Sequence, residues 1–186
     1  MSSTKNLNVP NLLTIFRICL IPILVYAFFR QDKYGNMLSF SIFIVGCITD
    51  SIDGIYARKA CQVTKLGQFL DPLADKLFVS ITITLIIGFN KITQYNIIAA
   101  IIILCRELIV SDMRNIAKAN SIQVRTSFVS KLKTFFQMCA FCLILFNQMH
   151  TYEYMITCSE ILLWISALLS IVSGIYYFIA YRFMFF

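Results

Sequence analysis

Charged side chains are scarce in this chain of 186 residues: only 13% are Asp, Glu, Lys or Arg, whereas 59% are hydrophobic. Soluble domains carry about 25% charged residues, so this chain has too little polar material to cover a water-facing surface. The deficit excludes an ordinary soluble protein. Acids are the rarer sign, with nine against sixteen Lys and Arg, and the net charge is +7. The places that these few acids occupy therefore bear directly on function.

Histidine and paired cysteine motifs are also in short supply. The chain has one histidine, His150, and shows no Ser–His or Cys–His arrangement for nucleophilic catalysis. Of its seven cysteines, only Cys139 and Cys142 form a C-x-x-C, and that pair lies inside an apolar run with no second pair. We therefore expect buried thiols rather than a zinc or redox site. The sequence has no internal repeat, low-complexity tract or linker, which predicts a single domain over residues 1–186.

Six hydrophobic runs are long enough, at about 20 residues, to cross a bilayer. They lie at residues 11–29, 36–57, 72–89, 95–116, 132–147 and 156–181. Helices satisfy their own backbone groups in hydrocarbon, and no alternating pattern indicates a barrel. The sequence thus predicts an all-α, polytopic membrane protein with six transmembrane helices.

The basic residues predict an orientation. Ten of the sixteen Lys and Arg fall on one side of the predicted spans: Lys5, Arg58, Lys59, Lys65, Arg114, Lys118, Arg125, Lys131, Lys133 and Arg182. Three fall on the other side: Arg30, Lys33 and Lys91. Because cytoplasmic loops are enriched in Lys and Arg, both termini are predicted to be cytoplasmic. The remaining three, Arg17, Lys76 and Arg106, lie within spans, where charges are costly and point to function.

Two pairs of aspartates lie at the cytoplasmic ends of predicted helices. Asp50 and Asp53 are three residues apart and Asp71 and Asp75 four apart, so each pair shares a helical face. Asp71 precedes Pro72, which predicts a helix that starts there with Asp71 as its N-cap. Two helices would thus present four carboxylates at similar depth.

Four carboxylates near hydrocarbon repel one another unless a cation neutralises them. Oxygen ligands without histidine or thiolate favour Mg²⁺, Mn²⁺ or Ca²⁺ over zinc. Gly54 and Ala57 remove bulk from the same helix end, and Arg58 offers a guanidinium suited to phosphate. These residues together predict a metal-dependent diphosphate site.

The complete pattern over residues 50–75 is D-x2-D-G-x2-A-R-x8-G-x3-D-x3-D. It resembles the signature of the CDP-alcohol phosphatidyltransferases. Residues 9–14 with Arg17, residues 105–108 with Arg114, and residues 131–134 resemble the branch that uses sn-glycerol 3-phosphate as acceptor. Ser130 departs from this pattern, since many relatives carry glycine there.

The resemblance implies a six-helix membrane enzyme, a homodimer, that joins CDP-diacylglycerol to sn-glycerol 3-phosphate and releases CMP. It implies Mg²⁺ or Mn²⁺ as cofactor, with Asp50, Asp53, Asp71 and Asp75 as metal ligands and Asp75 also as the base that deprotonates the acceptor hydroxyl. The residues implied in binding CDP-diacylglycerol are Asn11, Leu12, Leu13, Thr14, Gly54, Arg58 and Thr64.

The acceptor phosphate needs cationic partners of its own. We expect them among Arg106, Arg114, Lys131, Lys133 and Arg125. The positive-inside rule is an alternative explanation for the four in or near the loop, and a structural ion pair with Glu107 or another helix is the alternative for Arg106.

The sequence is compatible with other functions. A relative with serine or inositol phosphate as acceptor, and a carboxylate-lined cation or proton transporter, are the competing functions. Nucleic-acid binding, indicated by net charge alone, is the weakest, and an apolar basic chain more often meets anionic lipid. Tyr176, Tyr177 and Tyr181 predict an interfacial aromatic belt. The small-residue stripe of Ser166, Ser170, Ser173 and Gly174 predicts helix packing.

Overall fold

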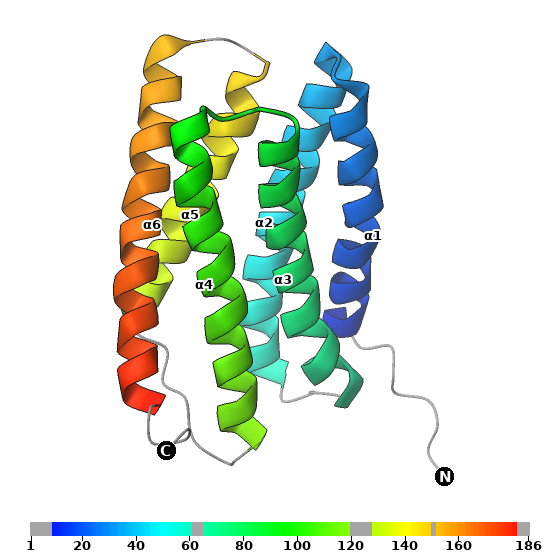
Figure 1. Ribbon diagram of the computed structural model, residues 1–186. Helices are drawn as coiled ribbons and strands as arrows, with labels where there is room; N and C mark the ends of the chain where they lie inside the picture. Colours follow the sequence, from blue (N-terminus) through cyan, green and yellow to red (C-terminus); the bar gives the residue numbers. More distant parts are fainter. Residues whose placement is uncertain (1–8, 61–64, 120–127, 150–151, 182–186) are drawn as a thin grey trace. The chain divides into compact units, whose positions relative to one another are not determined.

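The computed structural model describes residues 9–60, 65–119, 128–149 and 152–181; the side chains of residues 9–11, 51–60, 65–69, 71, 118–119 and 181 lie outside the description. Within these ranges the chain forms six α-helices and no strand (Figure 1). The helices are α1 (Val9–Arg30), α2 (Lys33–Ala60), α3 (Lys65–Gly88), α4 (Gln94–Ala119), α5 (Phe128–Asn147) and α6 (Glu153–Tyr181). Each helix covers one predicted hydrophobic run, so the all-α prediction is confirmed. The chain divides into two compact units, Met1–Phe89 and Asn90–Phe186, which are described separately.

Three segments of the described chain are long and apolar enough to cross a membrane. They are Leu12–Arg30 in α1, Phe128–Asn147 in α5 and Glu153–Ala180 in α6. The helices α2, α3 and α4 carry the aspartate pairs and the Arg106–Glu107 pair, charges that lower their apolar content. A membrane protein is therefore supported, whereas crossing by all six helices stays a prediction.

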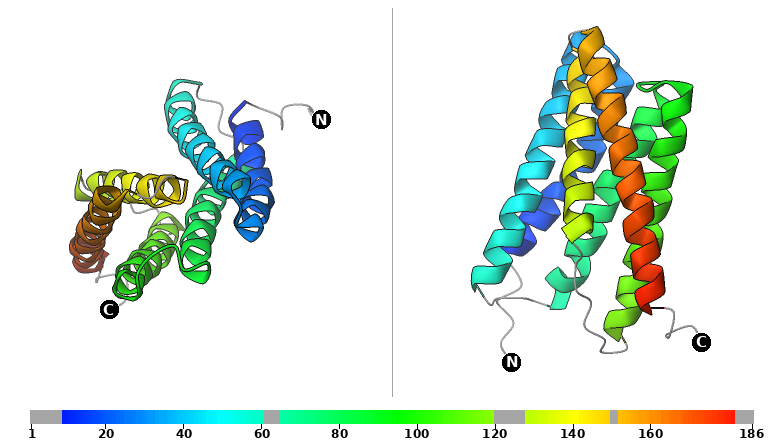
Figure 2. Two further views of the ribbon diagram at one scale, coloured as in Figure 1. Left: turned by 90° about the horizontal axis from the view of Figure 1, so that it is seen from above. Right: turned by 90° about the vertical axis from the view of Figure 1, so that its left-hand side faces the viewer.

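In the first unit, α1 packs against both α2 and α3 (Figure 2). The ring of Phe43 on α2 stacks on that of Phe78 on α3, with centroids 5.9 Å apart. Gly46 lies directly against the Phe78 ring, so any side chain at Gly46 would overlap it. The Phe78 side chain of α3 thus contacts α2 at Phe43 and Gly46.

The start of α2 is capped by Asp32. The Gly35 amide donates to Asp32 Oδ1 at 2.6 Å, and Arg30 pairs with Asp32 Oδ2 at 2.8 Å. The backbone hydrogen bond from Gly35 lowers the pKa of Asp32 below its ordinary value. A short connection is thus enough to reverse the chain between α1 and α2.

The start of α3 differs from the sequence prediction. The helix begins at Lys65, and Pro72 lies inside it, so the prediction that Asp71 caps a helix beginning at Pro72 is wrong. A proline has no N–H, so a helix that contains one loses the hydrogen bond to the carbonyl four residues earlier. Such prolines are tolerated in membrane helices, where neighbouring groups satisfy the freed carbonyl, and α1 likewise contains Pro22.

In the second unit, α6 packs against both α5 and α4 (Figure 2). Ser166, Ser170 and Ser173 on α6 are buried, and the Ser166 hydroxyl donates to the Lys133 carbonyl of α5 at 3.3 Å. The small-residue stripe therefore packs between helices, as predicted. Cys139 and Cys142 are part-buried free thiols.

Candidate active site

In the first unit, the candidate acidic site is organised around Arg17. Arg17 on α1 pairs with Asp50 on α2, with Nη1 and Oδ1 3.3 Å apart, and the same Nη1 makes a close ion pair with Asp75 on α3. The Arg17 side chain is 3% exposed, whereas those of Asp50 and Asp75 are 45% and 48% exposed. Three helices thus bring two part-exposed carboxylates to a single buried guanidinium.

The donor set of this acidic site fits a hard divalent cation. The carboxylates of Asp50 and Asp75 converge on one atom although they are 25 residues apart in the chain. They are oxygen ligands, which Mg²⁺ and Mn²⁺ prefer. The side chains of Asp53 and Asp71, the other two predicted ligands, lie outside the described residues, and no larger group of potential ligands occurs among the residues that are described.

The residues predicted to bind the donor are only partly described. Thr14 is fully buried on α1, three residues before Arg17 and therefore on the same face. Leu12 is 57% exposed, and Leu13 is half-buried. The side chains of Asn11, Gly54 and Arg58, and the whole of Thr64, lie outside the described residues.

In the second unit, a basic cluster joins α4, α5 and α6. The Arg106 guanidinium donates to the Ser130 hydroxyl at 3.2 Å and to the Ser173 hydroxyl at 2.9 Å. Arg114 donates to the Tyr177 hydroxyl at 2.8 Å and makes a longer contact, 3.5 Å, with the Ser130 hydroxyl. Ser130 thus accepts from two arginines that lie two turns apart on α4.

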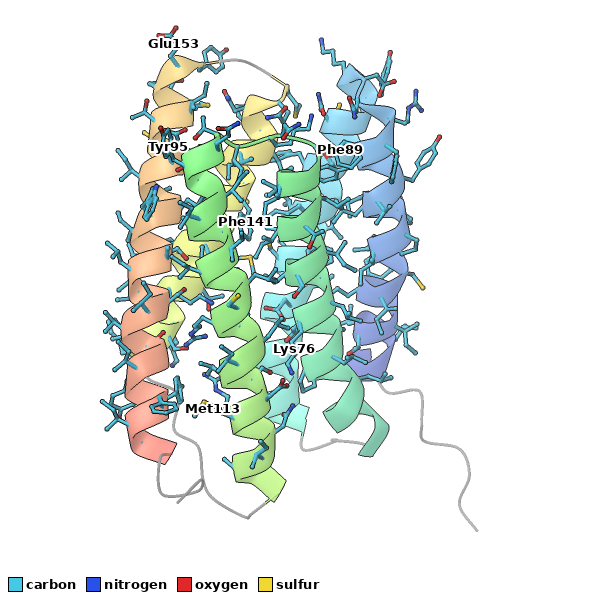
Figure 3. All side chains as sticks on the ribbon, in the orientation of Figure 1. Lys76, Phe89, Tyr95, Met113, Phe141 and Glu153 are labelled. Carbon is cyan, nitrogen blue, oxygen red and sulfur yellow. The ribbon has the colours of Figure 1, made fainter. Side chains whose placement is uncertain are left out.

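Tyr177 lies close to both guanidinium groups. Its ring centroid is 4.8 Å from Cζ of Arg114 and 5.8 Å from Cζ of Arg106, within the range of cation–π attraction. The residue is 1% exposed and packs with Val110, Met113 and Ala117 at the end of α4 where Figure 3 labels Met113. The prediction of an interfacial role for Tyr177 is therefore wrong.

The other two tyrosines of the predicted belt fare differently. Tyr176 is 59% exposed, which fits an interfacial position, and the side chain of Tyr181 lies outside the description. Tyr176 and Tyr177 are adjacent on α6 and so point to different sides of the helix.

Lys133 completes the basic cluster. Its side chain has no exposed area, and its ammonium makes a close ion pair with Oε1 of Glu107. Glu107 Oε2 is 3.7 Å from Arg106 Nη1. The ion pair foreseen as the alternative role of Arg106 is therefore present, and Lys133 shares it.

Charge in this cluster is unbalanced. Three cations, Arg106, Arg114 and Lys133, face the single carboxylate of Glu107 among the described residues, leaving an excess of two positive charges. Buried cations without counter-charges are costly, so this excess favours an anionic ligand. Lys131 is exposed and makes no ion pair with a described residue, and Arg125 lies outside the described ranges.

Several contact residues have no clear signal in the sequence. The convergence of Asp50 and Asp75 on Arg17, and the contacts of Ser173 and Tyr177 with the arginines, arise from tertiary packing. The only available signal is the presence of Arg17 and Glu107 within apolar runs, where a charge points to a specific partner.

The described residues thus define an all-helical protein with an acidic cluster in its first unit and a basic cluster in its second. The family model of the CDP-alcohol phosphatidyltransferases matches residues 7–172, and the chain belongs to this family.

Individual relatives are similar along most of the chain. A CDP-diacylglycerol–glycerol-3-phosphate 3-phosphatidyltransferase of Rickettsia bellii (strain RML369-C) is 38% identical, over 92% of this chain and 93% of the relative. Proteins of the same name from Wigglesworthia glossinidia brevipalpis and Yersinia enterocolitica are each 37% identical, over 96% and 88% of this chain and 98% and 89% of the relatives.

Proposed function

We propose that this chain transfers the phosphatidyl group of CDP-diacylglycerol to sn-glycerol 3-phosphate, which gives phosphatidylglycerophosphate and CMP. The observation that carries the proposal is the excess of two positive charges in the cluster of Arg106, Arg114 and Lys133. A phosphomonoester, with its charge near −2, balances that excess, whereas serine offers no such anion. Family membership and the names of the relatives support the same reaction.

In this proposal the chemical step is a direct displacement. The acceptor hydroxyl oxygen forms a bond to the phosphorus of the phosphatidyl group, and the bond from that phosphorus to the CMP oxygen breaks. Asp75 takes the proton of the hydroxyl, while CMP leaves with the electron pair of the broken bond. Arg106, Arg114 and Lys133 hold the phosphate of the acceptor, which limits the orientations of its hydroxyl.

Asp50 and Asp75, together with Asp53 and Asp71, are proposed to hold the metal, Mg²⁺ or Mn²⁺. When bound, such an ion supplies positive charge that stabilises the phosphate of the leaving CMP. Arg17 pairs with both Asp50 and Asp75 and so keeps these two carboxylates close together. Asn11, Leu12, Leu13, Thr14, Gly54, Arg58 and Thr64 are proposed to contact the donor, and Lys131 and Arg125 to add positive charge for the acceptor.

We also propose the arrangement in the membrane. Residues 1–186 would act as one catalytic domain that crosses a bacterial cytoplasmic membrane six times, with both termini and the reacting groups on the cytoplasmic side. The distribution of Lys and Arg supports the orientation. A homodimer is proposed from the family resemblance alone.

The test is a transfer assay with purified protein and radiolabelled sn-glycerol 3-phosphate, with and without CDP-diacylglycerol and Mg²⁺. We expect labelled lipid and CMP only when all three are present. Asp75→Asn should abolish transfer while donor binding is retained, and near-normal turnover of that variant would remove Asp75 from the role of base.

Alternative acceptors are tested in the same assay. Release of CMP with serine or inositol phosphate, but not with sn-glycerol 3-phosphate, would contradict the proposal. Metal-dependent ion flux without CMP release would instead favour a transporter.

A further inference from the structure

The second unit contains a cavity of about 390 Å³ at the end where α4 begins, α5 ends and α6 begins (Figure 1). Its volume falls in the range of small-ligand sites, about 300–1,000 Å³. One part of its lining is apolar: Ile92, Ile144, Ile156 and Leu163. The rest is polar: Asn90, Lys91, Thr93, Asn96, Asn147, Gln148, Ser159 and Glu160. The cavity thus has the mixed lining of a binding site for a polar group attached to an apolar one.

This cavity is distinct from the basic cluster. Arg106 follows Asn96 by ten residues on α4, which corresponds to about 15 Å along the helix axis. Figure 3 labels Tyr95 and Met113 toward opposite ends of α4, with Tyr95 at the cavity end. An inference about the cavity therefore does not depend on the proposed function.

The polar part of the lining is held in place by a chain of hydrogen bonds. Trp164 Nε1 donates to Asn96 Oδ1 at 2.9 Å, and Asn96 Nδ2 donates to Thr93 Oγ1 at 2.8 Å. The Thr93 hydroxyl donates to Glu160 Oε1 at 3.3 Å. The chain starts and ends on α6 and passes through the beginning of α4, so it fixes the Glu160 carboxylate at the cavity.

Lys91 and Glu160 bring opposite charges to the same cavity without pairing. Both are part-buried, and Lys91 makes no ion pair within 4 Å with any residue that the structure describes. Burial alone lowers the pKa of Lys91, as expected for a cation that has lost water and gained no counter-charge. A purely anionic ligand would be repelled by Glu160, and a purely cationic ligand would be repelled by Lys91. A ligand with one charge of each sign satisfies both.

We propose that this cavity binds a zwitterionic phosphate–amine group of the phosphoethanolamine type, with its phosphate at Lys91 and its ammonium at Glu160. The group can come from a membrane phospholipid or from a free phosphoethanolamine. The cavity lies at the adjoining ends of two candidate membrane spans, Phe128–Asn147 and Glu153–Ala180. Tyr95, Tyr152 and Tyr154 are exposed at this same end, as tyrosines are at the headgroup level of a bilayer.

The experiment uses the full chain in detergent and native mass spectrometry with defined lipids. Phosphatidylethanolamine is compared with phosphatidylglycerol, which lacks the amine, and with phosphatidylcholine, whose quaternary ammonium cannot donate a hydrogen bond to Glu160. Wild-type protein should retain phosphatidylethanolamine most strongly. Each of Lys91→Met and Glu160→Gln should weaken this binding roughly tenfold, as expected for loss of one hydrogen bond to a charged group.

The controls are Glu153→Gln, an exposed acid on the same helix as Glu160, and Lys33→Met, an exposed lysine of the first unit. Both should bind the lipid as wild type does. Soluble O-phosphoethanolamine distinguishes the two sources of the group. If it displaces the lipid, the site recognises the head group alone. If it does not, and lipid is lost only in the cavity variants, the site binds the whole lipid. Equal retention of all three lipids, or equal binding by cavity variants and controls, would overturn the proposal.

Discussion

The ion pair between Lys133 and Glu107 allows the structural and functional roles of the basic cluster to be separated. Lys133 has no exposed area, whereas the Glu107 side chain is 27% exposed. Removing one partner of a fully buried pair costs about 3–5 kcal/mol, because a charge is left buried alone. Since Glu107 is partly solvated and an amide can still accept a hydrogen bond, we expect Glu107→Gln to lower the free energy of unfolding by about 2–3 kcal/mol. In a chain of this length that lowers the Tm by roughly 4–12 °C.

The double variant Glu107→Gln with Lys133→Met should recover part of this loss. Methionine has a similar length and no charge, so no buried ammonium is left without its carboxylate, and only the contact of Glu107 with Arg106 is still lost. Thermal unfolding in detergent, read as a double-mutant cycle, measures the coupling between the two residues. The stable double variant should still show a raised KM for sn-glycerol 3-phosphate, because Lys133 is one of the proposed phosphate ligands.

The matched control is Lys131→Met, which removes an exposed lysine two residues away on the same helix and should leave the Tm unchanged. A Glu107→Gln variant as stable as wild type, or a double variant no more stable than the single one, would refute the reasoning that Glu107 compensates a buried charge. A double variant with wild-type KM would instead remove Lys133 from the acceptor site.

Three further predictions concern other contacts. Tyr177→Phe keeps the aromatic ring next to the arginines and should raise the KM for sn-glycerol 3-phosphate a few-fold, whereas Tyr177→Leu should raise it roughly tenfold. Steady-state kinetics should show an unchanged KM for CDP-diacylglycerol in both variants. Equal effects on both KM values would indicate a general structural defect. Arg17→Met leaves Asp50 and Asp75 without their shared cation, so the Tm should fall. As the Mg²⁺ concentration is raised, the Tm of this variant should increase more steeply than that of wild type. A Tm insensitive to Mg²⁺ would contradict a metal site there. Because the pKa of Asp32 is lowered on folding, its stabilising effect is complete above the ordinary pKa of 3.8 and is lost as the pH falls through the lower, folded value. The Tm of Asp32→Asn should thus lie below that of wild type at pH 7, and the difference should disappear in acid; a constant difference would contradict the assignment.

The helices could be predicted from sequence because each hydrophobic run is long and bounded by polar connections. The ends of the helices are harder to predict than their existence. Pro72 carries the local signal of a helix start, yet α3 begins seven residues earlier, at Lys65. Residue spacing fixes only which side chains share a face. It therefore predicts that Asp50 and Asp53 lie on one face of a helix. The contact of both Asp50 and Asp75 with Arg17 depends instead on how three helices pack.

Tyr177 illustrates the same limit within one dipeptide. A tyrosine near the end of an apolar run carries the same sequence signal whether it faces lipid or the protein interior. Tyr176 is exposed and Tyr177 is buried, and the difference follows from which side of α6 packs against α4. Arg106, Arg114 and Lys133, which meet in the basic cluster, are three of the five basic residues singled out from the sequence, whereas the serine and the tyrosine that contact the arginines were not predicted to do so.

Among the described residues Glu107 is the one carboxylate that faces Arg106, Arg114 and Lys133, and this imbalance also has a consequence for the lifetime of the protein. On the proposed assignment, this cluster without acceptor holds two positive charges that no described carboxylate compensates, and bound sn-glycerol 3-phosphate relieves their repulsion. Any ligand that binds only the folded chain stabilises it in proportion to the logarithm of its concentration relative to Kd. Abundance of the enzyme would then follow the supply of its own substrate, because the chain that lacks acceptor opens more often and is degraded sooner.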